Sequence, residues 1–223
     1  MNMLRTYGWR LALIGSGIAL VAGGRMHPEA DAKDSMREEL ATMTADDAWV
    51  LGHSLIVVST VLLATGLWLA RRHAVWPRSV GPALTLGAWA VSLYVVETLF
   101  HLGAAVDSDA LHDGEAAPVA YLHVGLSVVL YPVTGYAVAR LALSLGRAWR
   151  GLRWGVAALG VAAGVLHLAS VPFTVLFPDT ETTPLFAGAA MLLALWSVGT
   201  GLVGGGTPTP TGAGAQRNLE PVS

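Results

Sequence analysis

Long apolar blocks separated by short polar segments dominate the pattern of this chain. Each block holds almost no charge, and a helix needs about 20 apolar residues to cross the ~30 Å hydrocarbon core of a bilayer. The pattern therefore predicts an all-α fold, a polytopic integral membrane protein built as a bundle of six transmembrane helices. The predicted spans are residues 9–24, 48–70, 81–104, 118–139, 154–177 and 185–203.

The first of these blocks is the shortest and has two interpretations. Arg5 and Arg10 precede an apolar stretch that ends in Ala22, Gly23 and Gly24, which is also the outline of a cleaved signal peptide. We expect a retained span, which makes residues 1–203 one transmembrane domain. The sequence does not decide between retention and cleavage.

The segments outside the blocks differ in character. In the loop 25–47, Ser35 and Glu38 have the spacing of a capping box, and Met36, Leu40 and Met43 share one helical face. This loop should be helical in part and should cover one end of the bundle. Residues 204–223 are rich in Gly, Pro and Thr, which predicts a disordered tail.

Composition narrows the class further. Hydrophobic residues make up 54% of the 223 residues and charged residues only 13%, about half the fraction of a soluble domain. The absence of cysteine excludes disulfides, thiolate metal sites and iron–sulfur clusters. The single lysine, Lys33, lies in a polar loop, so a retinal Schiff base in a membrane helix is excluded. The scattered basic residues give no support to nucleic-acid binding.

Acidic and basic residues are segregated along the chain. The acids gather in the loops 26–47, 105–117 and 178–184, with Glu97 and Glu220 as exceptions. Most arginines fall at the other ends of the blocks, in the segments 5–10, 71–78 and 140–153. The positive-inside rule then predicts a multi-pass protein of the cell membrane with both termini and the tail in the cytoplasm and the acidic loops on the extracytoplasmic side.

Five ionisable side chains of metal-ligand type lie inside the predicted spans. A charged residue at the centre of a membrane helix costs roughly 2.5 to 3.5 kcal/mol on insertion scales, so ionisable residues there are functional candidates. Counted at ~1.5 Å per residue from the helix ends, all five lie in the half of the bilayer next to the acidic loops. We expect them to form one site. They are His53, Glu97, His101, His123 and His167.

The neighbours of these residues suggest roles. Tyr94, Glu97 and His101 lie on one stripe of the third predicted helix, so Glu97 is a candidate ligand or orienting carboxylate. Glu97 and Tyr94 are also the candidate general acid or base. Gly160 and Gly164 share a stripe with His167 and would let a flat cofactor or another helix approach closely, packing being the commoner use.

Several functions remain open on these residues. The first is a centre of iron, copper or zinc bound by His53, His101, His123, His167 and Glu97, acting as an oxidoreductase or hydrolase on a lipid, quinone or isoprenoid-like substrate. The second is an electron-transfer protein with one haem b, held by His53 with His123 or by His101 with His167. A cation transporter and a non-catalytic subunit of a membrane complex are further alternatives, the latter with the histidines only packing. His27 and His112 lie in acidic loops, where we expect them to be solvated.

Overall fold

The computed structural model describes residues 3–28, 35–178 and 180–205, and this part of the chain contains helices and no strand. The predicted tail from residue 206 onward lies outside the described residues. The long helices are α1 (Met3–Arg25), α3 (Ala48–Arg72), α4 (Gly81–Gly103), α6 (Pro118–Ala148), α7 (Leu152–Leu176) and α8 (Thr183–Val203). The short ones are α2 (Met36–Thr44), α5 (Ser108–His112) and the 3-10 turns Arg78–Val80 and Ala104–Asp107.

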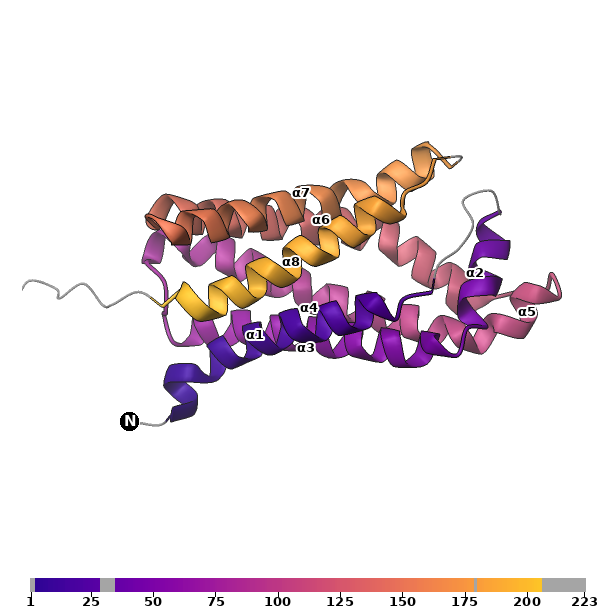
Figure 1. Ribbon diagram of the computed structural model, residues 1–223, viewed down its shortest axis with the longest axis horizontal. Helices are drawn as coiled ribbons and strands as arrows, with labels where there is room; N and C mark the ends of the chain where they lie inside the picture. Colours follow the sequence, from indigo (N-terminus) through magenta and orange to yellow (C-terminus); the bar gives the residue numbers. More distant parts are fainter. Residues whose placement is uncertain (1–2, 29–34, 179, 206–223) are drawn as a thin grey trace, which may run out of the picture.

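Six long helices form a closed ring. Helix α1 packs against α3, α3 against α4, α4 against α6, α6 against α7, α7 against α8, and α8 returns to α1. Figure 1 shows these helices running along the length of the molecule, with α1 and α3 on one side and α6 and α7 on the other. The interior is filled by fully buried side chains such as Leu13, Leu67 and Trp196.

Five of these helices are long and apolar enough to cross a membrane. They are α3, the segment from Arg78 to His112 that contains α4, and α6, α7 and α8. The prediction of a multi-pass helical membrane protein is confirmed for these five helices by their length and apolar composition. Helix α1 does not reach the same apolar character, because Arg10 lies within it and three glycines and a serine dilute its apolar residues between 8 and 17.

The helix that contains the fourth predicted span is longer than that span. The fourth span was expected to end at 139, but α6 continues to Ala148. Arg140 ends the apolar block but not the helix, because arginine is a good helix former. The helix ends only at Trp149, whose backbone is extended. The last turns of α6 therefore carry arginines at the end of the bundle.

The predicted helix in the first polar loop is present as α2, and its capping box is confirmed. The Ser35 side chain accepts from the Glu38 backbone N–H, and the Glu38 carboxylate accepts from the Ser35 backbone N–H at 2.8 Å. In Figure 1, α2 lies across one end of the ring beside α5. Arg37 holds the two together by donating to the carbonyl oxygens of Leu111 and Glu115. We call this end the capped end.

The opposite end is closed by contacts between the start of α1, the end of α8 and the loop before α4. The Trp76 indole N–H donates to the Gly204 carbonyl at 2.8 Å, and Arg10 donates to the Leu202 carbonyl at 3.1 Å. These bonds satisfy the last carbonyls of α8, which have no partner within the helix. We call this end, which holds the arginine-rich segments, the basic end.

Glycines set the closest helix approaches in the ring. A Cβ on Gly164 of α7 would lie 2.5 Å from both the Gly135 carbonyl oxygen and the Ala139 nitrogen of α6. A Cβ on Gly160 would lie 2.4 Å from the Trp196 ring of α8. Gly160 and Gly164 therefore lie against neighbouring helices, as the packing alternative for this stripe describes.

Replacing Gly164 with alanine should destabilise the protein, because the added methyl group meets backbone atoms that cannot move aside. We expect a loss of about 1 to 3 kcal/mol in the free energy of unfolding. The measurement is thermal unfolding in detergent followed by circular dichroism. Gly155→Ala on the same helix is the matched control, since its Cβ meets nothing within 4 Å. A midpoint for Gly164→Ala equal to that of the control would contradict the packing described here.

Candidate metal centre

Three helices bring ligand-type side chains together beneath the cap. His53 lies on the second turn of α3, Glu97 and His101 on the last two turns of α4, and His123 on the second turn of α6. The start of α6 is fixed by Asp107, whose carboxylate accepts from the backbone N–H groups of Val119 and Ala120 at 2.6 and 3.0 Å. The helix ends therefore set the common depth of these side chains.

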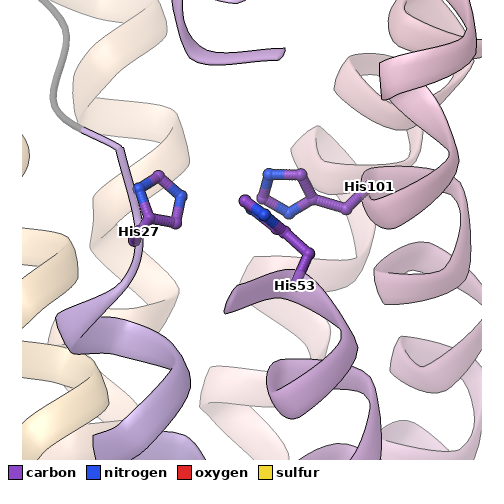
Figure 2. A group of neighbouring side chains, drawn as sticks. All are labelled: His27, His53 and His101. Carbon is purple, nitrogen blue, oxygen red and sulfur yellow. The ribbon is translucent and has the colours of Figure 1, made fainter. Parts of the chain in front are cut away.

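The first group consists of His27, His53 and His101. One ring nitrogen of each lies within 4.8 Å of those of the other two. The His53 ring centroid is 4.4 Å from that of His101 and 4.8 Å from that of His27. Figure 2 shows the three rings turned toward a common space from three separate segments of the chain. Three imidazoles at this spacing form a candidate metal site.

The expectation that His27 is solvated was wrong. His27 follows directly after α1, and a close approach of α1 to α3 carries it into the group. A Cβ on Gly23 would lie 2.7 Å from the Gly52 carbonyl oxygen, and one on Gly52 would lie 3.1 Å from the Met26 carbonyl oxygen. The signal in the sequence was the place of His27 just beyond a predicted span, at a depth similar to that of His53. The acidic loop around it pointed to solvent instead.

Carbonyl hydrogen bonds fix which nitrogen of two histidines is free. The Nδ1–H of His53 donates to the Trp49 carbonyl and the Nδ1–H of His27 to the Pro28 carbonyl, both at 2.8 Å, because a carbonyl oxygen can only accept. In the neutral rings this leaves the Nε2 lone pairs available, and the Nε2 of His53 is buried without a partner among the described residues. Backbone carbonyls orient ligand histidines in this way in metal sites.

The neutral state of His27 also follows from its surroundings. Burial lowers the pKa of His27, His123 nearby lowers it further, and only the hydrogen bond to Pro28 acts in the opposite direction. The ring is therefore uncharged at neutral pH. A metal ion requires this form, since a protonated imidazole has no lone pair to offer.

The second group consists of Glu97, His101 and His123, which also place one ligand atom each within 4.8 Å. The Nδ1 of His123 lies 2.8 Å from Oε1 of Glu97, and the His101 and His123 rings are stacked with centroids 3.9 Å apart. Glu97 is fully buried, yet neither carboxylate oxygen makes an aligned hydrogen bond to a described residue. The two atoms are thus within ion-pair distance without the alignment of a hydrogen bond, and His101 is common to both groups.

Trp49 forms the wall between the cap and the histidines. Its ring is fully buried, stacks on His53 with centroids 3.8 Å apart and meets the His101 ring edge-on at 5.4 Å. Its indole N–H donates to the Leu102 carbonyl at 3.2 Å, which ties α3 to the end of α4. Trp49 also belongs to a small apolar cluster under the cap, which consists of Leu40, Trp49, Ala104, Leu111, Ala117 and Ala120.

His167 and Tyr94 lie in a neighbouring aromatic cluster. The Tyr131 ring stacks on His167 at 4.3 Å between centroids, and the Tyr94 ring meets His167 edge-on at 5.1 Å. The structure does not group His167 with the other predicted ligands, although its Nε2 is buried without a partner among the described residues. Tyr94 is one turn from Glu97 on α4, between this cluster and the second group. His112 is exposed, as expected.

The arrangement offers four imidazoles and one carboxylate, of which His53, Glu97 and His123 are buried and His27 and His101 are half-buried. Imidazole and carboxylate together suit zinc, iron and copper. A buried carboxylate that no hydrogen bond satisfies is costly on its own, and an ion placed among these lone pairs would compensate it. The chemistry of the donor set therefore fits a transition metal.

Glu97→Gln should raise the stability of the metal-free protein. The substitution keeps the shape of the side chain and removes a buried charge that makes no aligned hydrogen bond, so we expect a gain of about 1 kcal/mol. Chemical or thermal unfolding in detergent with a chelator present measures it. Glu115→Gln, in an exposed position, is the control and should change stability by less than ~0.5 kcal/mol. A clear loss of stability for Glu97→Gln would show that the carboxylate is already satisfied by protein groups.

Comparison with protein-family models, with curated proteins and with solved structures gives no match for this chain. The function must therefore be inferred from the two groups of side chains beneath the cap. Their chemistry, burial and free lone pairs are the observations that bear on it.

Proposed function

We propose that this chain is an integral membrane metalloprotein whose centre binds a transition metal ion at the capped end of the helical ring. The candidate donors are His27, His53, His101, His123 and Glu97. The observation that carries the proposal is the overlap of two ligand groups at His101, with lone pairs that no described protein group satisfies. Relative to the sequence prediction, His27 joins the ligand set and His167 leaves it.

The donor set favours zinc, iron or copper. Structural and catalytic zinc sites use histidine and carboxylate ligands, and non-haem iron uses histidines with one carboxylate. With five candidate donors and at most four needed for a tetrahedral ion, one side chain is free for another role. We assign that role to Glu97, which would accept a proton from metal-bound water or a substrate hydroxyl.

The ring contacts favour a small ion over a haem. Two axial imidazoles must lie on opposite faces of a wide macrocycle. Here His101 stacks on His123, Trp49 stacks on His53, and all of these centroids are within 4 Å of their partners. A haem would have to separate these rings, whereas an ion fits among their nitrogen atoms.

The substrate class follows from the surroundings of the centre. The helices that carry it are apolar on their outer faces and suited to a bilayer, and the aromatic cluster of Tyr94, Tyr131 and His167 adjoins it. We propose metal-dependent chemistry, redox or hydrolytic, on a membrane-soluble molecule such as a quinone or an isoprenoid-like lipid. Tyr94 is the candidate second proton donor, because it lies one turn from Glu97.

Metal content tests the centre directly. We expect the full chain, purified in detergent without chelators, to hold about one equivalent of zinc, iron or copper by mass spectrometry of the metals. His101→Gln should lower metal affinity by at least roughly tenfold, since even residues that only orient ligands contribute 10- to 100-fold. His112→Gln, exposed, and His167→Gln, in the aromatic cluster, should both keep the metal.

Three outcomes would count against this assignment. Full metal retention in a His101→Ala, His123→Ala double variant that still folds would rule out the proposed ligand set. Loss of metal in His167→Gln would show that the metal binds in the aromatic cluster instead. A Soret band in the absorption spectrum that shifts on reduction would show that the cofactor is a haem and not a single ion.

We further propose that α1 is a sixth span, with both termini in the cytoplasm and the capped end outside. Helix α1 completes the ring between α3 and α8, and the arginine-rich segments gather at the basic end. Because the chain has no cysteine, single cysteines report its topology. A membrane-impermeant maleimide should label Asp113→Cys in intact cells, and Asn2→Cys and Ser79→Cys only after permeabilisation. Labelling of Asn2→Cys together with Asp113→Cys would place both ends of α1 on the same side.

A further inference from the structure

A hollow on the outer face of the ring lies far from the metal centre, between α6 and α7 toward the basic end. It has a volume of about 720 Å³, within the range of ligand pockets, and is open to one side. Gly146 of α6 and Ala158 and Ala162 of α7 leave the space, because none of them has a side chain beyond Cβ. Leu143, Val161 and Val165 form the rest of an apolar wall.

Two arginines lie at the mouth of the hollow. Arg147 ends α6 and Arg150 lies in the turn before α7, and both are exposed. Neither arginine forms an ion pair with a carboxylate of a described residue. The acidic loops are at the capped end, across the length of the ring. The mouth therefore has an unbalanced positive charge.

The dimensions fit one chain of a lipid. From Trp154 to Leu166 the wall follows α7 for twelve residues, or about 18 Å, which is roughly one leaflet of a ~30 Å hydrocarbon core. Trp154 is 62% exposed at the level of the arginines, as aromatic residues at the membrane interface are. The hollow thus runs from a cationic mouth at the membrane surface to an apolar end near the middle of the bilayer.

We propose that this hollow binds one anionic glycerophospholipid of the leaflet at the basic end. Its phosphate lies against Arg147 and Arg150, and one acyl chain lies along Ala158, Ala162 and Leu166. Guanidinium groups form paired hydrogen bonds to phosphate oxygens, and basic pockets between membrane helices select anionic headgroups. The site does not depend on the metal centre, because it uses other helix faces at the other end of the ring.

Native mass spectrometry of the full chain tests the proposal. The protein in detergent is titrated with dioleoylphosphatidylglycerol and, separately, with dioleoylphosphatidylcholine. We expect one phosphatidylglycerol to bind in clear preference to phosphatidylcholine. Arg147→Gln with Arg150→Gln should lower this preference roughly 25-fold, since each arginine near an anionic headgroup contributes a factor of about five.

Two controls separate this site from general charge attraction. Arg72→Gln with Arg78→Gln removes the same charge at the same end of the ring, from exposed positions outside the hollow, and should keep the preference. Ala162→Phe fills the hollow from an exposed position, leaves both arginines intact and should lose the bound lipid. An equal loss in the Arg72, Arg78 variant, or lipid retained in Ala162→Phe, would overturn the proposal. A dimer that Ala162→Phe dissociates would show instead that a second copy of the chain fills the hollow.

Discussion

The need to satisfy polar side chains inside an apolar ring is the constraint on which the rest of this structure depends. A buried polar group without a partner costs free energy, and in a membrane there is no water to supply one. Most interior polar residues of the described part of the chain meet the constraint by hydrogen bonds to one another or to backbone groups. Ser16 and Ser59 lie 3.2 Å apart, Thr60 and Thr98 lie 3.1 Å apart, and Ser197 donates to the Leu13 carbonyl at 2.7 Å.

The histidine–glutamate cluster is the main departure from that rule. His53 Nε2, His123 Nδ1 and both oxygens of Glu97 are buried without aligned hydrogen bonds to described residues. Trp196 and Thr200 also have an unpartnered atom, but an indole N–H can only donate and a lone hydroxyl is a weak ligand. Apart from Nε2 of His167 in the aromatic cluster, the unsatisfied atoms that can bind a cation lie beneath the cap, as a metal centre there would require.

Close backbone contacts hold this cluster in place. Without side chains at Gly23 and Gly52, α1 approaches α3 closely enough to deliver His27 to His53. Trp49 then fills the space between the cap and the rings and joins α3 to α4 through the Leu102 carbonyl. The same helix face therefore provides a ligand, the contact that positions another ligand, and the wall that keeps the site apolar.

The sequence alone was sufficient for the helices and for much of the cluster. Apolar block length predicted five helices that the structure confirms as candidate spans, and the spacing of Ser35 and Glu38 predicted the start of α2. Counting residues from the helix ends brought His53, His101 and His123 to one depth, where the structure groups them with neighbouring ligands. Depth is readable in this way because helical rise per residue is constant.

Only the tertiary structure decided which residues share the cluster. His167 is on a predicted ligand stripe but turns to Tyr94 and Tyr131, while His27, from a loop that looked solvated, lies among the ligands. Rotation of each helix about its own axis, and the path of a chain beyond a helix end, depend on packing against neighbours that are distant in sequence. The sequence by itself therefore determined the helices, their charge pattern and the depth of the polar residues. Their convergence on His101 was decided by the closure of the ring.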